Sequence, residues 1–223
     1  MSLVQRLESL DTCVLSDALE TLGHYGAVGG IVQMWECGRI AGQARTVALR
    51  RLEPGETPPG GPHLGARAIV AAAPGDVVVV SHAGRTDSAG WGGLLSAAAL
   101  AAGVRGCLVD GACRDVDDAV TLQFPLFALA STPATARGRT VEEAYDVAVP
   151  FGDVTVRPGD WVVADRTGVV VVPADIVDDV LAKAEQMHAD ERAMLAALHD
   201  GTPVTNVLGQ HYEDMVVSRP TTK

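Results

Sequence analysis

The spacing of apolar segments changes along the chain, and this change restricts the fold more than any other feature of the sequence. Before about residue 130, helical patterns alternate with short apolar runs such as VVVVS at 77–81. Between 147 and 173, three or four short strands follow one another closely, separated by Gly-Asp and Pro-Gly turns. Helices that alternate with strands, followed by a run of strands, predict an α/β protein built as a layered sandwich. Aromatic residues make up only 4% of the chain, so we expect a core of valine, leucine, isoleucine and alanine.

The expected elements can be placed along the chain from periodicity and turn residues. Helices are expected at 3–22 (with a fresh start capped by Ser16), 63–73, 92–103, 116–122 and from Pro173 to about His199. Strands are expected at 39–49, 77–81, 106–109 and 126–129, in addition to the later run. We expect a loop at 82–91 and a turn opened by Asp110-Gly111. A length of 223 residues suits a single domain, 1–223, with its last helix and tail from about 174.

The balance of charges disfavours nucleic acids and membrane surfaces as partners. The chain has 17 basic and 28 acidic residues, a formal net charge of -11, and no basic cluster. A field of this sign repels nucleic-acid phosphates and anionic lipid headgroups. The sequence shows no apolar run typical of a signal peptide or a membrane span, and its four cysteines are scattered. We therefore expect a cytoplasmic protein with free thiols, and no nucleotide cofactor, because no glycine-rich phosphate loop follows a strand.

A helix that begins with two glycines is the first candidate site. In GWGGLLSAAALAAG at 90–103, the free backbone N–H groups of the helix start point outward. Since Gly92 and Gly93 have no Cβ, an anion such as a carboxylate can approach these groups closely. The alternative is that the glycines only permit a tight turn from strand to helix, and the segment taken alone slightly favours that alternative.

The segment VDGACRDVDD at 109–118 supplies the second candidate site. Arg114 and Asp115 follow a buried strand, at the end where α/β proteins gather ligands. An arginine can bind a carboxylate or an enolate oxygen through two parallel donors, and an aspartate offers one hard oxygen ligand to Mg²⁺. The residues by themselves leave a simple surface ion pair equally open.

Other polar side chains are weaker candidates. His82 precedes the Gly92 helix and could act as an acid or a base, whereas His63 and the remaining histidines are expected at the surface or in an interface. Arg137 and Arg139 could reach a distal carboxylate of a substrate, although the charges of a solvated loop explain them more simply.

Six segments carry a resemblance to a known family. They occur in the family's order over about 180 residues: LSDALETLG, GRIAGQARTV, APGDVVVV, WGGLLSAAA, VDGACRD and DRTGVVVVP. The chain resembles the 4-hydroxy-4-methyl-2-oxoglutarate aldolase family, which also includes the ribonuclease E regulator RraA. The combination of G-x-L-L with G-x-x-R-D at this spacing is specific to that family.

The resemblance implies a fold, a site and an assembly. The implied fold is the layered β/β/α sandwich of the family's swivelling domain, in a homotrimer or homohexamer. The implied cofactor is a divalent cation, Mg²⁺ or Mn²⁺, bound by Asp115. Arg114 is implied to bind the substrate and to act in catalysis. The pyruvyl end of the substrate is implied to lie against Gly92, Gly93, Leu94 and Leu95.

The implied activity is carbon–carbon cleavage of a 2-oxo acid through a pyruvate enolate, as a metal-dependent aldolase, an oxaloacetate decarboxylase or both. The alternative is a non-catalytic, protein-binding regulator of ribonuclease activity of the RraA type. Such regulators depart from the Arg-Asp pair, which this chain keeps at Arg114-Asp115. Aldolases carry an acidic residue where this chain has Gly93, and Asp87 and Asp110 are the acids nearby in sequence that could replace it. A methyltransferase has little support, because no glycine-rich cofactor loop follows an early strand.

Overall fold

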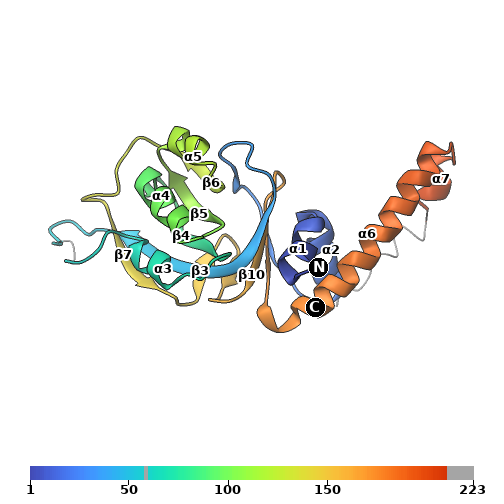
Figure 1. Ribbon diagram of the computed structural model, residues 1–223, viewed down its shortest axis with the longest axis horizontal. Coiled ribbons are helices and arrows are strands. Elements are labelled where there is room, and N and C mark those ends of the chain that lie inside the picture. The colour runs from blue at the N-terminus through green and yellow to red at the C-terminus, as the bar shows by residue number, and fades with distance from the viewer. Residues whose placement is uncertain (58–59, 210–223) are drawn as a thin grey trace.

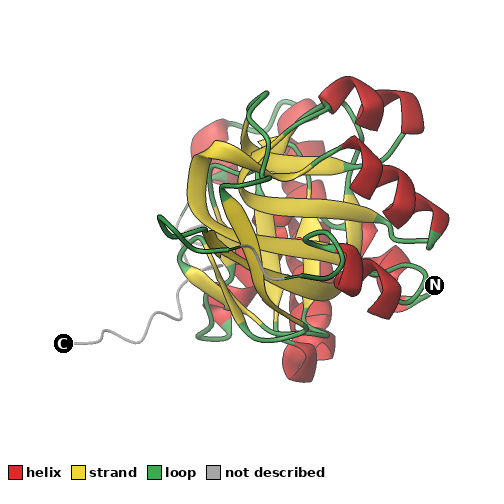
Figure 2. Ribbon diagram, turned by 90° about the vertical axis from the view of Figure 1, so that its left-hand side faces the viewer, coloured by secondary structure: helices red, strands yellow, loops and turns green. Residues whose placement is uncertain are grey.

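The computed structural model describes residues 1–57 and 60–209 and centres on one large mixed sheet (Figures 1 and 2). The strand order is β1-β11-β10-β3-β4-β5-β6-β2, β7 also pairs with β3, and β8 and β9 form a separate hairpin. The strands are β1 Ala27–Val28, β2 Val32–Gln33, β3 Ile40–Arg51, β4 Val77–Trp91, β5 Gly106–Cys113, β6 Leu126–Ser131, β7 Thr140–Tyr145, β8 Val149–Phe151, β9 Val154–Val156, β10 Trp161–Ala164 and β11 Val169–Val172. The helices are α1 Leu3–Ser9, α2 Thr12–Thr21, α3 Ala66–Ala71, α4 Gly93–Ala101, α5 Val116–Leu122, the 3₁₀ turn η1 Ala174–Ile176, α6 Val177–His199 and α7 Val204–Val207.

Three layers of apolar side chains hold these elements together. Strands β3, β4, β5 and β6 are parallel, and α3, α4 and α5 cover one face of them. Their other face packs on β8, β9, β10 and β11 through a layer rich in valine. Helices α1, α2 and α6 cover the outer side of β10 and β11, and α6 then extends away from the body (Figure 1). The predicted layered α/β fold is confirmed, and its core consists mostly of valine, leucine and alanine, as the composition predicts.

The strand β3 is shared by two parts of the sheet, and this sharing explains the layered arrangement. Its first residues, Ile40 to Gln43, pair antiparallel with β10, and the next, Ala44 to Ala48, pair parallel with β4. Because β3 continues from one pairing into the other, the parallel strands and the later run of short strands face each other across a common core. The carboxyl ends of β4 and β5 therefore lie side by side at one edge of the parallel strands.

Two predictions about the strands near the candidate site were wrong. The expected loop at 82–91 forms the last ten residues of β4, which keeps pairing with β5 through three register shifts up to Trp91 and Cys113. The expected turn at Asp110-Gly111 belongs to β5, and the chain leaves the sheet only after Cys113. Glycine and polar residues hid the strands, yet Gly111 is needed within β5 because its φ is 154° and a Cβ would lie 2.8 Å from His82 Cβ.

The starts of two helices also differ from the prediction. Helix α2 begins at Thr12, and its cap is Asp11, whose carboxylate accepts a hydrogen bond from the N–H of Val14 at 2.9 Å, so Ser16 lies inside the helix. Helix α6 begins at Val177, after the 3₁₀ turn that follows Pro173. Within residues 1–57 and 60–209, none of the helices combines the length and the apolar character needed to cross a bilayer.

Candidate functional site

The candidate site lies where β4 and β5 end. The N–H of Arg114 donates a hydrogen bond to the carbonyl of Trp91 at 3.0 Å, which ties the last residue of β4 to the first residue after β5. Helix α4 starts just beyond Trp91, and helix α5 starts just beyond Asp115. The two segments singled out from the sequence, far apart along the chain, thus meet at the carboxyl edge of the parallel strands, where α/β proteins bind ligands.

Gly92 is required by the close packing of these two segments. A Cβ at this position would lie 2.9 Å from Cγ of Arg114 and 2.9 Å from Oδ2 of Asp115. Its backbone is extended, so the requirement comes from space and not from backbone strain. A side chain at Gly92 would displace both Arg114 and Asp115. The close packing therefore explains why position 92 is a glycine.

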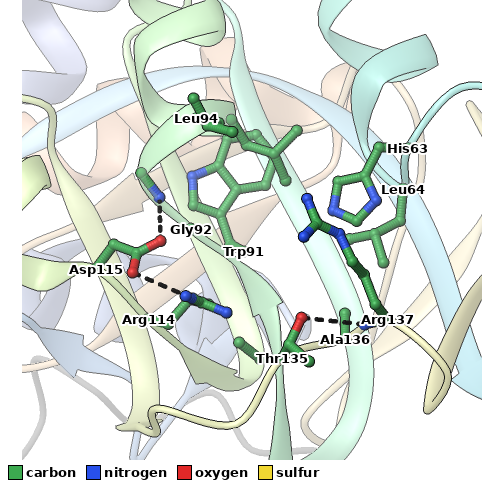
Figure 3. A pocket seen from close by; sticks show the side chains of 13 residues that line it. His63, Leu64, Trp91, Gly92, Leu94, Arg114, Asp115, Thr135, Ala136 and Arg137 are labelled. Carbon is green, nitrogen blue, oxygen red and sulfur yellow. Dashed lines mark hydrogen bonds and ion pairs between the residues drawn. The ribbon is translucent and has the colours of Figure 1, made fainter.

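Asp115 has an unusual backbone and connects two helices. Its φ of 56° and ψ of 44° lie in the left-handed region, which costs a non-glycine residue on the order of 1 kcal/mol. The carboxylate does not cap its own helix α5. Instead, Oδ2 accepts a hydrogen bond from the N–H of Gly93 at 3.0 Å, and Oδ1 accepts one from Nε of Arg114 at 3.1 Å (Figure 3). A strained aspartate held by its neighbours is typical of functional sites.

A cavity of about 260 Å³ opens beside this pair of residues (Figure 3). Its apolar wall includes the buried side chains of Trp91, Leu64 and Leu95. The indole Nε1 of Trp91 donates to Oγ of Ser96 at 3.0 Å, which fixes the ring against the start of α4. The lining residues are His63, Leu64, Ala89, Trp91, Gly92, Gly93, Leu94, Leu95, Arg114, Asp115, Thr135, Ala136 and Arg137.

All six site residues predicted from the sequence line this one cavity: Gly92, Gly93, Leu94, Leu95, Arg114 and Asp115. Leu94 lies at the rim, with 84% of its surface exposed, so its side chain does not form part of the buried wall. The structure thus brings the predicted residues together, while their roles in binding and catalysis stay predictions.

Two neighbouring side chains are less suited to chemistry. His82 is fully buried, its Nε2 lies 2.9 Å from the carbonyl oxygen of Ser88, and it is not among the described residues that line the cavity. Burial raises the pKa of the Cys113 thiol to about 11. Since this thiol stays protonated near neutral pH, Cys113 does not supply a thiolate nucleophile. The buried position of His82, away from the cavity wall, likewise gives no support to a role for it as an acid or a base.

The space that a side chain at Gly93 would occupy is filled by Asp118. A Cβ at Gly93 would lie 2.2 Å from Oδ2 and 3.0 Å from Cγ of this carboxylate, which comes from the first turn of α5. The two acids considered from the sequence lie elsewhere. Asp87 pairs with Arg51 and Arg85, and Asp110 belongs to the buried strand β5. Asp118 is therefore the acid that stands at the Gly93 position in space.

The carboxylates of Asp115 and Asp118 are the oxygen donors available to a cation beside the start of α4. In the part of the chain that the structure describes, no group of three or more His, Cys, Asp or Glu side chains could hold a metal ion. Hard oxygen donors suit Mg²⁺ or Mn²⁺, and such ions commonly keep waters and bind through one or two carboxylates. Each Asp115 oxygen accepts one hydrogen bond and keeps a further lone pair. The residues fit a cation whose other ligands are water and substrate.

Six lining residues were not selected from the sequence as parts of a site: His63, Leu64, Ala89, Trp91, Thr135 and Ala136. Arg137, which the sequence favoured only as a solvated charge, also lines the cavity, whereas Arg139 hydrogen-bonds the carbonyl of Thr135. The loop between β6 and β7 is brought here by backbone hydrogen bonds, from Ala89 N–H to the carbonyl of Ala134 and from Thr132 N–H to that of Cys113. No local pattern in the sequence reveals this placement.

The family model described as RraA-like, Aldolase/RraA, matches residues 12–171, which include the whole cavity-lining set. The chain belongs to the RraA-like family. A protein of Halalkalibacterium halodurans, provisionally named a 4-hydroxy-4-methyl-2-oxoglutarate aldolase, is 32% identical over 198 residues, 88% of this chain and 89% of that protein. The chain spans only 34% to 64% of the length of several other curated relatives.

Solved structures share this fold, and a member of the RraA family is among them. An uncharacterized protein from Pseudomonas syringae pv. tomato has a TM-score of 0.82 and 31% identity, covering 93% of this chain and 96% of that one. Streptomyces coelicolor RraAS2, described as an unusual member of the RNase ES inhibitor RraA family, has a TM-score of 0.76 and 28% identity, covering 86% of this chain and 96% of that one. The family thus includes proteins named as aldolases and proteins named as ribonuclease inhibitors.

Proposed function

We propose that this RraA-like protein is a divalent-metal-dependent carbon–carbon lyase that cleaves a 2-oxo acid to pyruvate, by retro-aldol reaction, by decarboxylation of oxaloacetate, or by both. The observation that carries the proposal is the convergence of Arg114, Asp115 and the start of α4 on one small cavity. Both reactions break the C3–C4 bond of a 2-oxo acid and leave the electron pair on a pyruvate enolate. A single site that stabilises this enolate can therefore serve both reactions.

The start of α4 binds the carboxylate of the substrate. The first N–H groups of a helix have no acceptor within the helix, and the helix dipole favours an anion there. Because the N–H of Gly93 already donates to Asp115, the groups left for the substrate are those of Leu94 and Leu95. The anion is thus placed one residue further along α4 than the position at Gly92 and Gly93 that was expected from the sequence.

Arg114 stabilises the oxygen on which negative charge develops. Its Nε is held by Asp115, so the two Nη groups remain to donate to the enolate oxygen. Fixed donors that meet a developing charge act without reorganising during the reaction. Asp115 thereby orients the catalytic arginine as well as offering an oxygen ligand to a cation.

A divalent cation held by Asp115 would supply Lewis-acid stabilisation of the 2-oxo acid's oxygens. Schiff-base chemistry, the other route of aldolases, needs a lysine, and the chain has only Lys183 and Lys223. Lys183 lies on α6, on the far side of the molecule from α4 (Figure 1), and Lys223 falls outside the described residues. The described site therefore favours the metal-dependent route.

Asp118 does not line the cavity of Figure 3, but it lies beside Gly93 and lines an adjoining cavity together with Arg114 and Asp115. From there it accepts, through a water, the proton that the retro-aldol reaction releases from the 4-hydroxyl group. Decarboxylation has no such proton, so the two reactions should respond differently to loss of this carboxylate. We expect Asp118→Asn to lower retro-aldol kcat roughly 10-fold, less than a buried general base would give because solvent reaches the site. The rate of oxaloacetate decarboxylation should change less than 3-fold, because this reaction releases no hydroxyl proton. A 3-fold change corresponds to roughly 0.6 kcal/mol in the barrier.

Steady-state rates of both reactions on one preparation check this expectation. Asp117→Asn is the matched control, since Asp117 is an exposed acid of the same helical turn. Equal loss in both reactions would show that Asp118 acts on a shared step and not as the base. A second arm introduces Gly93→Asp into the Asp118→Ala background, where the carboxylate is gone and only the Cβ of residue 118 stays close to the new Cβ, at 3.0 Å. This variant should restore retro-aldol activity.

A non-catalytic regulator of ribonuclease activity is the second candidate, because the Streptomyces neighbour is described as a member of an RNase inhibitor family. The retained Arg114–Asp115 pair at the wall of a cavity favours the lyase. A coupled assay of pyruvate release over a panel of 2-oxo acids separates the two. We expect turnover with Mg²⁺ or Mn²⁺ and its loss in excess chelator. Absence of pyruvate release from the whole panel, together with inhibition of a ribonuclease by the same preparation, would contradict the lyase.

A further inference from the structure

Residues 82–88 form a bulge in β4, next to the part of this strand that lines the cavity. Between two of their paired residues, β5 advances by two positions (110 to 112), whereas β4 advances by eight (81 to 89). The chain turns within the bulge at Ala83, whose φ of 54° lies in the left-handed region and is strained for an alanine. The bulge therefore depends on other interactions to keep its shape.

The imidazole of His82 links the two ends of this bulge. Its Nε2 lies 2.9 Å from the carbonyl oxygen of Ser88, so the neutral ring with its proton on Nε2 donates a hydrogen bond from the first residue of the bulge to the last. The ring is fully buried, and two glycines leave room for it. A Cβ at Gly90 would lie 3.2 Å from Cγ of the ring, and a Cβ at Gly111 would lie 2.7 Å from Cδ2. His82 is thus packed between the last residues of β4 and of β5.

The residues of β4 that follow the bulge hold the cavity wall in place. Ala89 and Trp91 line the cavity. The N–H of Ala89 donates to the carbonyl of Ala134 at 3.0 Å and so holds the loop between β6 and β7, while the carbonyl of Trp91 accepts from the N–H of Arg114. A shift of this short stretch of β4 would therefore move both the loop and the candidate catalytic arginine. His82 reaches the site only through the backbone.

A positive charge on His82 is disfavoured where the ring lies. Protonation adds an N–H at Nδ1, which is buried and has no hydrogen-bond partner within residues 1–57 and 60–209. Burial is the largest cause of a pKa below the ordinary value of 6.5 for this imidazole, and the like charge of Arg85 adds to it. The carbonyl of Ser88 and the carboxylates of Asp87 and Asp110 act in the opposite direction without cancelling the effect of burial.

We infer that His82 is a positioning residue, whose neutral imidazole keeps the bulge of β4 closed and the cavity wall in place, and whose protonation opens the bulge. In the open form the ring meets water and its pKa returns toward 6.5. The closed form is therefore favoured above about pH 6.5 and loses ground as the pH falls below it, because the open form then binds a proton more readily. The inference concerns the integrity of the cavity, and only its consequence for catalysis rests on the proposed function.

Amide hydrogen exchange tests the inference without turnover. After correction for the intrinsic pH dependence of exchange, the protection of amides 85–91 should fall roughly 10-fold between pH 7 and pH 5, as linkage to one proton gives. The amides of β10, in the other part of the sheet, serve as the internal reference and should change less than 2-fold. His82→Gln keeps a neutral N–H donor at every pH and should hold the protection of amides 85–91 constant within 2-fold.

Three further measurements separate this role from a general structural one. His24→Gln makes the same change at an exposed histidine and should keep the pH response of the unmodified protein. His63→Gln removes the other histidine whose pKa burial lowers, and it should keep the response as well. NMR titration of the His82 ring in the unmodified protein should give the same midpoint as the loss of protection. A response that persists in His82→Gln, that disappears in His63→Gln, or that occurs while the His82 ring stays neutral would overturn the inference.

Pyruvate release should follow the same dependence on pH. We expect kcat to fall with the protection of amides 85–91 in the unmodified protein and to fall less in His82→Gln. Loss of amide protection with kcat unchanged would show that the bulge does not support the site. If the unmodified protein releases no pyruvate, the lyase proposal fails, whereas the exchange measurements still decide the role of His82.

Discussion

Replacing Asp115 with asparagine is expected to lower lyase activity by about 10³-fold, about 4 kcal/mol of transition-state stabilisation, on both retro-aldol and decarboxylation substrates. Asparagine keeps an oxygen that accepts the hydrogen bond from the N–H of Gly93, so the junction of α4 and α5 should survive. It removes the negative charge that would hold a divalent cation and the ion pair that orients Arg114. Both losses act on the same step, and the effect should therefore exceed that of any other single change at the site.

Two measurements on the same preparation check this expectation. Titration with Mn²⁺, followed by calorimetry, should show weaker metal binding in Asp115→Asn, and a thermal melt should show a Tm close to that of the unmodified protein. Asp117→Asn again serves as the matched acid and should leave both metal affinity and activity unchanged. Full activity of Asp115→Asn in excess chelator would show that neither the carboxylate nor a metal takes part in the reaction.

Much of this site could be predicted because its central residues lie in two continuous segments. The two glycines before a helical pattern and the Arg-Asp pair after an apolar run are local features, and parallel strands must bring their carboxyl ends to one edge. The position of Asp118 near Asp115 could also have been predicted from the sequence. It stands three residues after Asp115 on a predicted helix, and residues at this spacing lie on the same face.

The distal end of the cavity could not be predicted in the same way. His63 and Arg137 come from loops before α3 and after β6, and their meeting depends on backbone hydrogen bonds between residues distant in sequence, such as Ala89 and Ala134. The last ten residues of β4 could not be predicted for a related reason. Its residues alternate neither in polarity nor in size, and the pairing with β5 persists only through register shifts. The distal end of the cavity and the length of β4 both depend on pairing between residues distant in sequence. Patterns within a single segment do not predict such pairing.

The second large effect is expected for Arg114. We expect Arg114→Lys to lower kcat by roughly 10²-fold, about 2.7 kcal/mol, with the Tm nearly unchanged. Lysine keeps the positive charge but loses the planar group that can donate to Asp115 and to the enolate oxygen at the same time. Because negative charge on that oxygen grows as the C3–C4 bond breaks, the loss should appear in kcat more than in KM.

The fold should tolerate this change, since the Arg114 side chain is 37% exposed and forms its ion pair with the neighbouring residue Asp115. A partly exposed pair of this kind contributes little to stability, on the order of 0–1 kcal/mol. Steady-state kinetics beside a thermal melt therefore separate the two roles that the structure allows. Unchanged kcat would make Arg114 only a partner that orients Asp115, and a large fall in Tm would make it a structural link between the ends of β4 and β5. A fall in kcat together with weaker binding of oxalate, a mimic of the pyruvate enolate, and with KM and Tm little changed, is the result that places the guanidinium against the transition state.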